Sequence, residues 1–239
     1  MVGLPLGLLI ALLSPAWTAY DEFTHFARVV DMAQGNLEPA RTPDGVGSVI
    51  PSAYREATDE IILDHQAGRA PWTPTSVRAL LGHRPDGSTV FVDTRPTTAS
   101  SPLGYLPATL GALVPVAVGA PGVVVLWASR LASLAAYLLL ASWAVRTAAS
   151  FRWSIAIAAT IPLNLALAAS VSPDGLAIAA VLLVVAMWTR VEGGGDVALP
   201  ALIASSGLLA LAKPPYFLVL GLFVASAFLE RTAGRIRAA

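Results

Sequence analysis

A short segment near the amino terminus places acidic, imidazole and guanidinium side chains at helical spacing. Asp21, His25 and Arg28 are separated by four and three residues, so they share one face of a helix expected over residues 21–35. Glu22 stands beside Asp21. Carboxylates next to an imidazole suit general acid–base chemistry. A structural interpretation stays open, in which the two acids only stabilise the positive end of the helix.

The opposite face of this helix is apolar and carries Phe23, Phe26, Val30 and Ala33. We expect an amphipathic juxtamembrane helix that lies on the membrane, with its phenylalanines toward lipid. Its charged face would then be directed toward water or a cleft.

Three charged residues stand farther along, within apolar sequence, where an ionisable group is costly unless it is paired or reaches an interface. Arg130 could snorkel to the membrane surface or bind a phosphate there. Asp174 could cap a helix, and Lys213 could stabilise the negative end of another. One topology places all three at the same membrane surface as Asp21. We therefore expect a shared site that holds an anionic lipid.

The composition of the chain is that of a membrane protein. Of its 239 residues, 56% are hydrophobic and 13% are charged, whereas a soluble domain carries roughly 25% charged residues. The mean hydropathy is +0.68. A net charge of zero and a single lysine exclude a nucleic-acid partner, because phosphate binding needs clustered basic residues. The absence of cysteine excludes disulfides, thiolate metal sites and cysteine nucleophiles.

The distribution of charge divides the chain into segments. We expect a first transmembrane helix over residues 1–20, a large extracytoplasmic loop over 21–101, and an interfacial or re-entrant apolar element over 102–122. A block of five transmembrane helices over 123–229 and a basic cytoplasmic tail over 230–239 follow. The expected fold class is an all-α polytopic membrane protein with about six transmembrane helices.

The five expected spans of the block cover residues 123–145, 153–170, 175–189, 197–212 and 215–229. The preceding segment, 102–122, contains four prolines and four glycines, which makes a continuous helix unfavourable. If this segment does not cross the membrane, six arginines fall on one side, with Asp174 and Lys213 opposite. The alternative is seven spans, with the large loop in the cytoplasm.

Five short motifs follow one another along residues 1–225. They are Asp21-Glu22 with His25 and Phe26, Pro102-Leu103-Gly104-Tyr105, Arg130-Leu131, Ser172-Pro173-Asp174-Gly175 and Leu211-Ala212-Lys213. In order and spacing they resemble the GT-C membrane glycosyltransferases, and most closely a bacterial group of uncharacterised predicted polytopic membrane proteins. The resemblance implies an enzyme of the cytoplasmic (inner) membrane that takes its sugar from a polyprenyl-phosphate donor, with membrane lipid as its other partner.

The resemblance also implies roles for the candidate residues. Asp21, with Glu22 beside it, matches the catalytic carboxylate of the first extracytoplasmic loop. The implied reaction is an inverting transfer, in which a base deprotonates the acceptor hydroxyl while the lipid phosphate leaves from the opposite face of the sugar. Arg130 and Lys213 match positions that bind the lipid phosphate.

Asp174 matches the second acidic position of the family, and His25 is a supporting acid–base group. A divalent cation is a candidate cofactor there, although one imidazole and two carboxylates do not identify a metal. The chain departs from the family at Ser101-Pro102-Leu103, where an HPP-like sequence is expected. It also stops after the last expected span, which indicates a fragment or module of a longer enzyme.

Other functions stay open from the sequence. The chain could be a non-enzymatic transporter or a scaffold subunit of a cell-envelope assembly, although it shows no internal repeat of the kind that transporters carry. The large loop could also recognise a partner protein. Within it we expect helices over 57–67 and 74–81 and a strand over 88–93.

Overall fold

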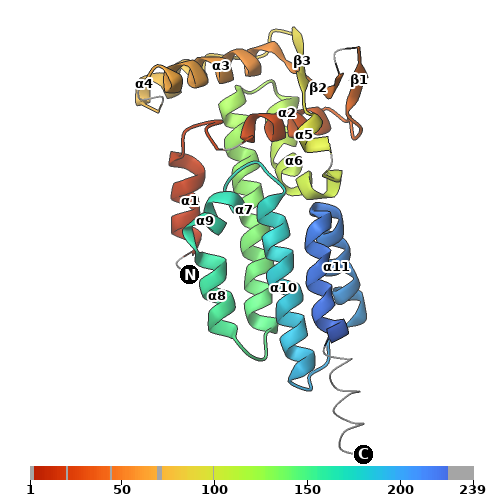
Figure 1. The fold of residues 1–239 in the computed structure, drawn as a ribbon. Coiled ribbons are helices and arrows are strands. Elements are labelled where there is room, and N and C mark those ends of the chain that lie inside the picture. Colours follow the sequence, from red (N-terminus) through yellow and green to blue (C-terminus); the bar gives the residue numbers. More distant parts are fainter. Residues whose placement is uncertain (1–2, 20, 44, 69–71, 99, 226–239) are drawn as a thin grey trace, which may run out of the picture.

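The computed structural model describes most of the chain (Figure 1). The described residues are 3–19, 21–43, 45–68, 72–98 and 100–225. They form two regions, an insert layer (α2 to α6) and a helical block (α1 and α7 to η1). The longer helices of the block run roughly parallel to one another beneath the layer in Figure 1. The expected tail over 230–239 lies outside the described residues.

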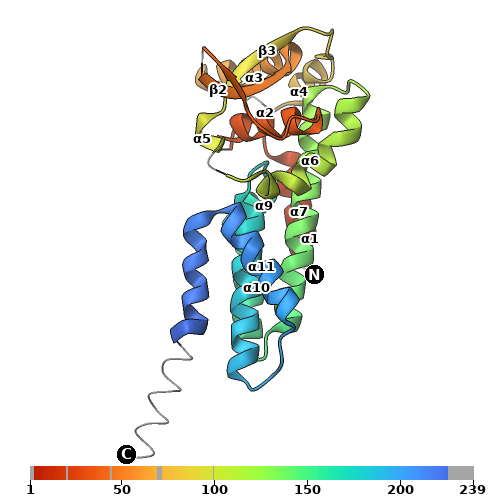
Figure 2. The same cartoon turned by 90° about the vertical axis from the view of Figure 1, so that its right-hand side faces the viewer.

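The insert layer combines helices with a small sheet. Its elements are α2 (Glu22–Ala33), β1 (Ala40–Thr42), β2 (Gly45–Pro51), α3 (Ser52–Gln66), α4 (Pro74–Leu80), β3 (Thr89–Asp93), α5 (Arg95–Thr98) and α6 (Pro102–Ala117). The elements of the helical block are α1 (Gly3–Leu13), α7 (Gly122–Thr147), α8 (Arg152–Thr160), α9 (Pro162–Ala168), α10 (Asp174–Glu192), α11 (Leu199–Ala212) and the 3-10 helix η1 (Pro214–Leu220). Figure 2 shows α11 beside α10, with η1 after it.

The expectation of an all-α fold is wrong in one respect, because three strands pair antiparallel in the order β1-β2-β3. The sequence pattern predicts only the third. Gly47 interrupts the apolar alternation of β2, so the sequence pattern does not predict this strand. The same glycine allows β2 to pair closely with β3. A Cβ at this position would lie 2.1 Å from the carbonyl oxygen of Val92 on β3. The helices expected over 57–67 and 74–81 are present as α3 and α4.

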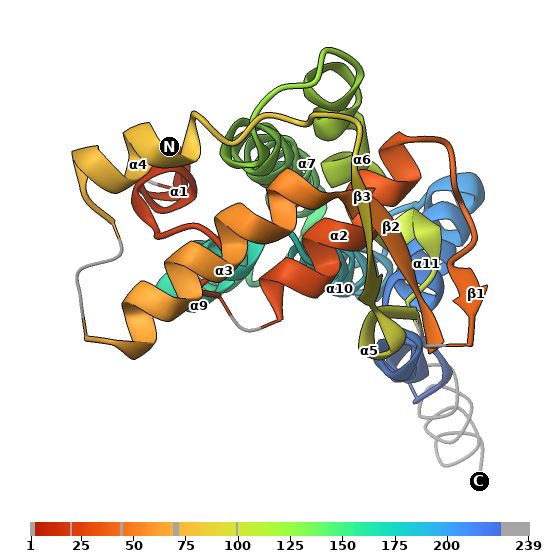
Figure 3. The same cartoon turned by 90° about the horizontal axis from the view of Figure 1, so that it is seen from above.

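The apolar face of α2 forms the core of the insert layer. Phe26 and Val30 are fully buried, and the Phe26 ring lies 5.6 Å from that of Trp17 and 6.0 Å from that of Tyr54. Figures 1 and 3 show α2 beneath α3 and the sheet. The expectation that these phenylalanines face lipid is therefore wrong. The periodicity of α2 does not reveal that α6, β2 and Tyr54 of α3 pack against this helix.

Segment 102–122 contains a continuous helix, α6, against the expectation from its prolines. Pro107 and Pro115 both lie inside it. Packing on α7 compensates for the hydrogen bonds that proline cannot donate. The two backbones approach closely at Gly111, where a Cβ would lie 2.4 Å from the carbonyl oxygen of Ala128.

One side of α6 remains apolar and exposed. This side carries Leu103, Leu106, Leu110, Val114 and Val118. Such a face favours contact with lipid at the membrane surface. The interfacial or re-entrant placement of the segment stays a prediction.

The span expected over 153–170 consists of two helices. Pro162 begins α9 and restricts Ile161, the residue before it, to an extended conformation with φ −56° and ψ 131°. Asn164 Nδ2 donates to the carbonyl oxygen of Ala158 at 2.8 Å, which satisfies an acceptor at the end of α8. The break is thus built into the local sequence.

Among the described residues, two helices are long and apolar enough to cross a membrane, α7 with 26 residues and α10 with 19. These lengths correspond to about 39 and 28 Å of helix, against about 30 Å of hydrocarbon. The other apolar helices are shorter, and α1 ends at Leu13 instead of continuing to residue 20. The spans expected over 123–145 and 175–189 correspond to α7 and α10, while the total of six or seven stays a prediction.

Replacing Gly111 with alanine tests the contact between α6 and α7. The new Cβ would lie 2.4 Å from the carbonyl oxygen of Ala128, so the helices must separate, and overpacking of this kind costs about 1 to 3 kcal/mol. We expect a lower midpoint of thermal unfolding in detergent, followed by circular dichroism. The control is Gly207→Ala in α11, where nothing lies within 4 Å. That variant should be at least as stable as the parent chain, because alanine is the better helix former. An unchanged midpoint for Gly111→Ala would contradict the close packing.

Candidate functional site

A fully buried ion pair joins the insert layer to the helical block. Glu22 begins α2, Arg130 lies in the first half of α7, and both side chains are 1% exposed. Arg130 Nε donates to Glu22 Oε1 at 2.8 Å, and Nη2 donates to Oε2 at 2.6 Å. This bidentate geometry is the strong form of the arginine–carboxylate contact.

The remaining donors of Arg130 hold the turn that follows α1. Nη1 donates to the carbonyl oxygens of Ala11 and Ser14 at 3.2 and 2.9 Å. Nη2 donates to that of Pro15 at 3.0 Å. All five N–H groups of the guanidinium are thereby engaged by protein. None is left for a lipid phosphate.

Glu22 also reaches the loop before α10, where its Oε1 accepts a hydrogen bond from the backbone N–H of Val171 at 3.2 Å. The pair therefore connects α1, α2, α7 and this loop. The catalytic role expected of Glu22 and the phosphate contact expected of Arg130 stay predictions, and this geometry does not favour them. It gives both residues a positioning role.

A second ion pair lies at the end of the helical block that meets the insert layer. Asp174 is the first residue of α10, Lys213 directly follows α11, and Lys213 Nζ donates to Asp174 Oδ1. The side chains are 26% and 38% exposed, so this pair is open to solvent. Asp174 makes no capping hydrogen bond, and Pro173 occupies the cap position. The capping interpretation of Asp174 is therefore not supported.

His25 is oriented by a tyrosine from α6. Its Nδ1 lies 2.7 Å from the hydroxyl oxygen of Tyr105, and that hydroxyl donates to the carbonyl oxygen of Thr97 at 3.4 Å. The hydrogen bond to Tyr105 fixes the orientation of the imidazole through Nδ1 and leaves Nε2 on the other side of the ring.

The charges that act on His25 show which candidate residues the structure brings together. Burial lowers the pKa of the imidazole from its ordinary value of 6.5. The carboxylates of Asp174, Asp21 and Glu22 raise this pKa, and the ammonium of Lys213 lowers it further. These groups come from α2, from the start of α10 and from the end of α11. Among these groups, Lys213 and Asp174 are in direct contact, and the others act on His25 through their charge.

Asp21 precedes α2 in a conformation that is uncommon for a residue with a side chain. Its φ is 55°, in the left-handed region, which costs roughly 1 to 2 kcal/mol outside glycine. The side chain is exposed and makes no capping hydrogen bond. Asp21 thus stands at the start of α2 without capping the helix through its side chain. Strain of this kind is concentrated at functional sites.

Arg28, the third member of the charged face of α2, is buried. It donates to the carbonyl oxygen of Asn36 at 3.2 Å and to that of Leu37, and its Nη1 lies 3.7 Å from Asp31 Oδ2. Burial raises the pKa of Asp31. Arg28 thus closes the turn after α2 and does not face a cleft.

Within the described residues, no group of three or more His, Asp or Glu side chains is placed to hold a metal ion. The candidate residues do not fit the divalent cation considered from the sequence, and no step below uses one. Two contributors to the site were not singled out as site residues. Tyr105 stands in the motif that begins at Pro102, which is a usable signal. Val171 acts through its backbone, for which the sequence carries no signal.

Long apolar helices beneath a polar layer define a helical membrane protein. The family model described as "Predicted membrane protein (DUF2142)" matches residues 4–237, so the chain belongs to this family. No curated protein and no solved structure matches the chain. The expected membrane class and the expected group of uncharacterised predicted membrane proteins are thereby confirmed. The kind of membrane and the side of the large loop stay predictions.

Breaking the buried pair should destabilise the chain strongly. Glu22→Gln leaves the guanidinium of Arg130 buried without a counter-charge, a change that costs about 3 to 5 kcal/mol. Arg130→Met strands Glu22 in the same way. We expect the double variant to lose less unfolding free energy than the two single variants lose together. A double-mutant cycle of thermal unfolding measures this difference. Asp59→Asn, which breaks an exposed pair with Arg55, should cost at most about 1 kcal/mol. Additive effects of Glu22→Gln and Arg130→Met would refute the coupling.

The buried imidazole should make the fold less stable in mild acid. Since the folded pKa of His25 lies below 6.5, the unfolded chain binds the proton first as the pH falls, and unfolding becomes more favourable. His25→Gln should therefore flatten the decline of unfolding free energy between about pH 7 and about pH 5. NMR titration of histidine-labelled chain, with the signal assigned by its loss in His25→Gln, gives the pKa directly. A value at or above 6.5 would contradict the burial effect.

Proposed function

We propose that the chain is a GT-C-type glycosyltransferase, or the amino-terminal module of one, that transfers a sugar from a polyprenyl-phosphate donor at the outer face of the cytoplasmic membrane. The observation that carries the proposal is the exposed carboxylate of Asp21, whose backbone is held in the left-handed conformation. Its charge acts on His25, as do the charges of the Asp174–Lys213 pair. This cluster lies where apolar helices meet the polar layer. The headgroup of a lipid-linked sugar lies at the same level when its tail is in the bilayer.

Asp21 is the base of the proposed reaction. Its carboxylate takes the proton of the acceptor hydroxyl while the hydroxyl oxygen bonds to the anomeric carbon of the sugar. The bond from that carbon to the phosphate oxygen breaks, and its electron pair stays on the phosphate. Attack and departure occur on opposite faces, so the anomeric configuration inverts. The products are the glycosylated acceptor and polyprenyl phosphate.

Lys213 stabilises the leaving phosphate in this proposal. Its ammonium has three N–H donors, of which Asp174 takes one, and a cation at this position offsets the charge that develops on the phosphate. The N–H groups of Arg130 all donate to protein acceptors. In this proposal Arg130 therefore acts with Glu22 to position α2. His25, which is neutral at pH 7 because its pKa is lowered, presents Nε2 to a sugar hydroxyl.

Asp21→Asn tests the assignment of the base. Asparagine tolerates the left-handed conformation, so the backbone should be preserved while the carboxylate is lost. We expect transfer from radiolabelled undecaprenyl-phosphate hexoses, in membranes that contain the full chain, to fall by at least about a hundredfold. Membrane expression should not change. The matched control is Asp86→Asn in an exposed turn of the insert layer, where Asp86 accepts hydrogen bonds from Ser88.

Two outcomes would count against the proposal. Equal transfer by Asp21→Asn and the parent chain would reject Asp21 as the base. Transfer no higher than in membranes without the chain, for every donor in the panel, would favour the non-enzymatic alternative of a transporter or scaffold subunit.

A further inference from the structure

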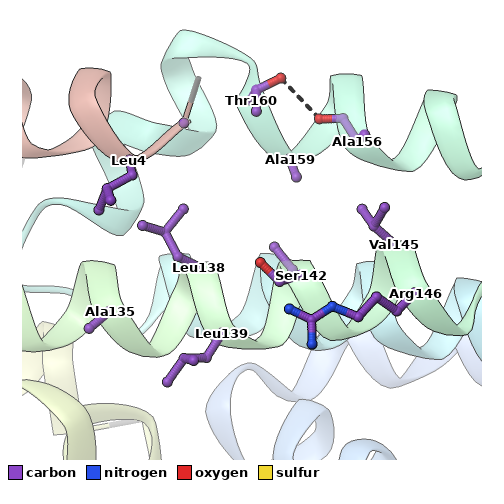
Figure 4. Close-up of a pocket in the computed structure, with 12 residues that line it drawn as sticks. Leu4, Ala135, Leu138, Leu139, Ser142, Val145, Arg146, Ala156, Ala159 and Thr160 are labelled. Carbon is purple, nitrogen blue, oxygen red and sulfur yellow. Dashed lines mark hydrogen bonds between the residues drawn. The ribbon is translucent and has the colours of Figure 1, made fainter. Parts of the chain in front are cut away.

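A groove lies along the C-terminal half of α7, at a distance from the candidate site (Figure 4). Its volume is about 690 Å³, and the walls come from α1, α7 and α8. The lining is almost entirely apolar or small and includes Gly3, Leu4, Leu138, Ser142 and Ala159. Figure 4 shows Leu138 and Val145 directed from α7 toward Ala159 on the facing helix. None of the residues of the candidate site lines it.

One charged residue, Arg146, lies at the end of this groove. Side chains on a helix lean toward its amino terminus, and in Figure 4 the guanidinium of Arg146 runs back along α7 toward Ser142. The guanidinium therefore lies alongside α7 at the groove and does not extend beyond the end of the helix. Arg146 makes no hydrogen bond or ion pair with any described residue. At membrane depth, an arginine without a protein partner favours an anion from its surroundings.

The length of the groove indicates which kind of molecule can bind in it. Ala135 lies eleven positions before Arg146 on α7, which corresponds to about 16 Å along the helix. This is about half of a hydrocarbon core of roughly 30 Å, which is the depth of one leaflet. Gly3 and Leu4 of α1 close the far end. A further transmembrane helix would need the whole thickness, whereas one acyl chain needs only this half.

Aromatic side chains mark the level of the open end. Trp143 on α7 and Trp153 at the start of α8 are 44% and 81% exposed, and Phe151 between the two helices is also exposed. Exposed tryptophan at a helix end is characteristic of the headgroup region of a bilayer. Arg146 therefore stands near the depth at which a phospholipid carries its phosphate.

We propose that this groove is a binding site for an anionic phospholipid, with one acyl chain between α7 and α8 and the phosphate paired with Arg146. The site is separate from the proposed glycosyl transfer. It requires only that the helical block lies in a bilayer, and it does not depend on which side of the membrane the arginines face.

Native mass spectrometry of the full chain in detergent tests this site with two lipids of identical tails, dioleoyl phosphatidylglycerol and dioleoyl phosphatidylcholine. We expect the anionic lipid to be retained about fivefold more than the zwitterionic one, the effect of one basic residue at a membrane surface. Arg146→Gln should abolish this preference. The matched control is Arg190→Gln at the same end of the block, because Arg190 does not line the groove and donates to the carbonyl oxygen of Asp196.

A second variant separates the groove from the charge. Ser142→Leu fills the groove and keeps Arg146, so it should lower retention of both lipids while circular dichroism shows an unchanged helix content. Equal retention of the two lipids by the parent chain would overturn the proposal. An equal loss of the preference for the anionic lipid in Arg190→Gln and in Arg146→Gln would also overturn it. The same holds if a folded Ser142→Leu chain retains as much of both lipids as the parent chain.

Discussion

The buried contact between Glu22 and Arg130 is the interaction on which the arrangement of the candidate site depends. Removing both charges from water is unfavourable, and such a pair persists only where geometry and further hydrogen bonds satisfy every polar atom. Here the carboxylate accepts from a backbone N–H and the guanidinium donates to three carbonyl oxygens. The start of α2 is therefore fixed against α7 and the loop before α10. Asp21 and His25, which flank Glu22 in sequence, are placed by the same contact.

The two ion pairs near the site differ in burial, and this difference favours a structural role for Glu22–Arg130 and a ligand-binding role for Asp174–Lys213. Arg130 has no free donor, and an incoming anion would have to displace several protein acceptors at once. The Asp174–Lys213 pair is partly exposed and makes a single contact, so an anionic headgroup can compete for Lys213 at small cost. Sequence position alone suggested equal roles for both cations. Burial and the number of hydrogen bonds distinguish them.

Periodicity and charge predicted much of this structure, and long-range contacts account for the rest. The long apolar runs correspond to α7 and α10. Asp174, Asp21, Glu22 and Lys213 all act on the pKa of His25, while a site shared by these residues stays a prediction. The apolar face of α2 was assigned to lipid because the periodicity of α2 does not show that other elements pack against Phe26, among them α3 through Tyr54. The sequence likewise did not reveal the buried partner of Arg130. An arginine in apolar sequence signals that a partner is needed, but its partner Glu22 stands 108 positions away.

The two arginines of α7 meet the same physical constraint in different ways. Arg130 lies sixteen residues before Arg146, or about 24 Å along the helix, so both stand within one membrane thickness of roughly 30 Å. At Arg130 the insert layer supplies the carboxylate of Glu22, and α1 with the turn after it supplies three carbonyl oxygens. At Arg146 the described protein supplies nothing, and an apolar groove adjoins the charge. Because the exposed guanidinium of Arg146 stands near the level of phospholipid phosphates, its proposed partner is the headgroup of an anionic lipid. The α7 helix thus has one arginine that fixes the fold and one that remains available to bind a lipid.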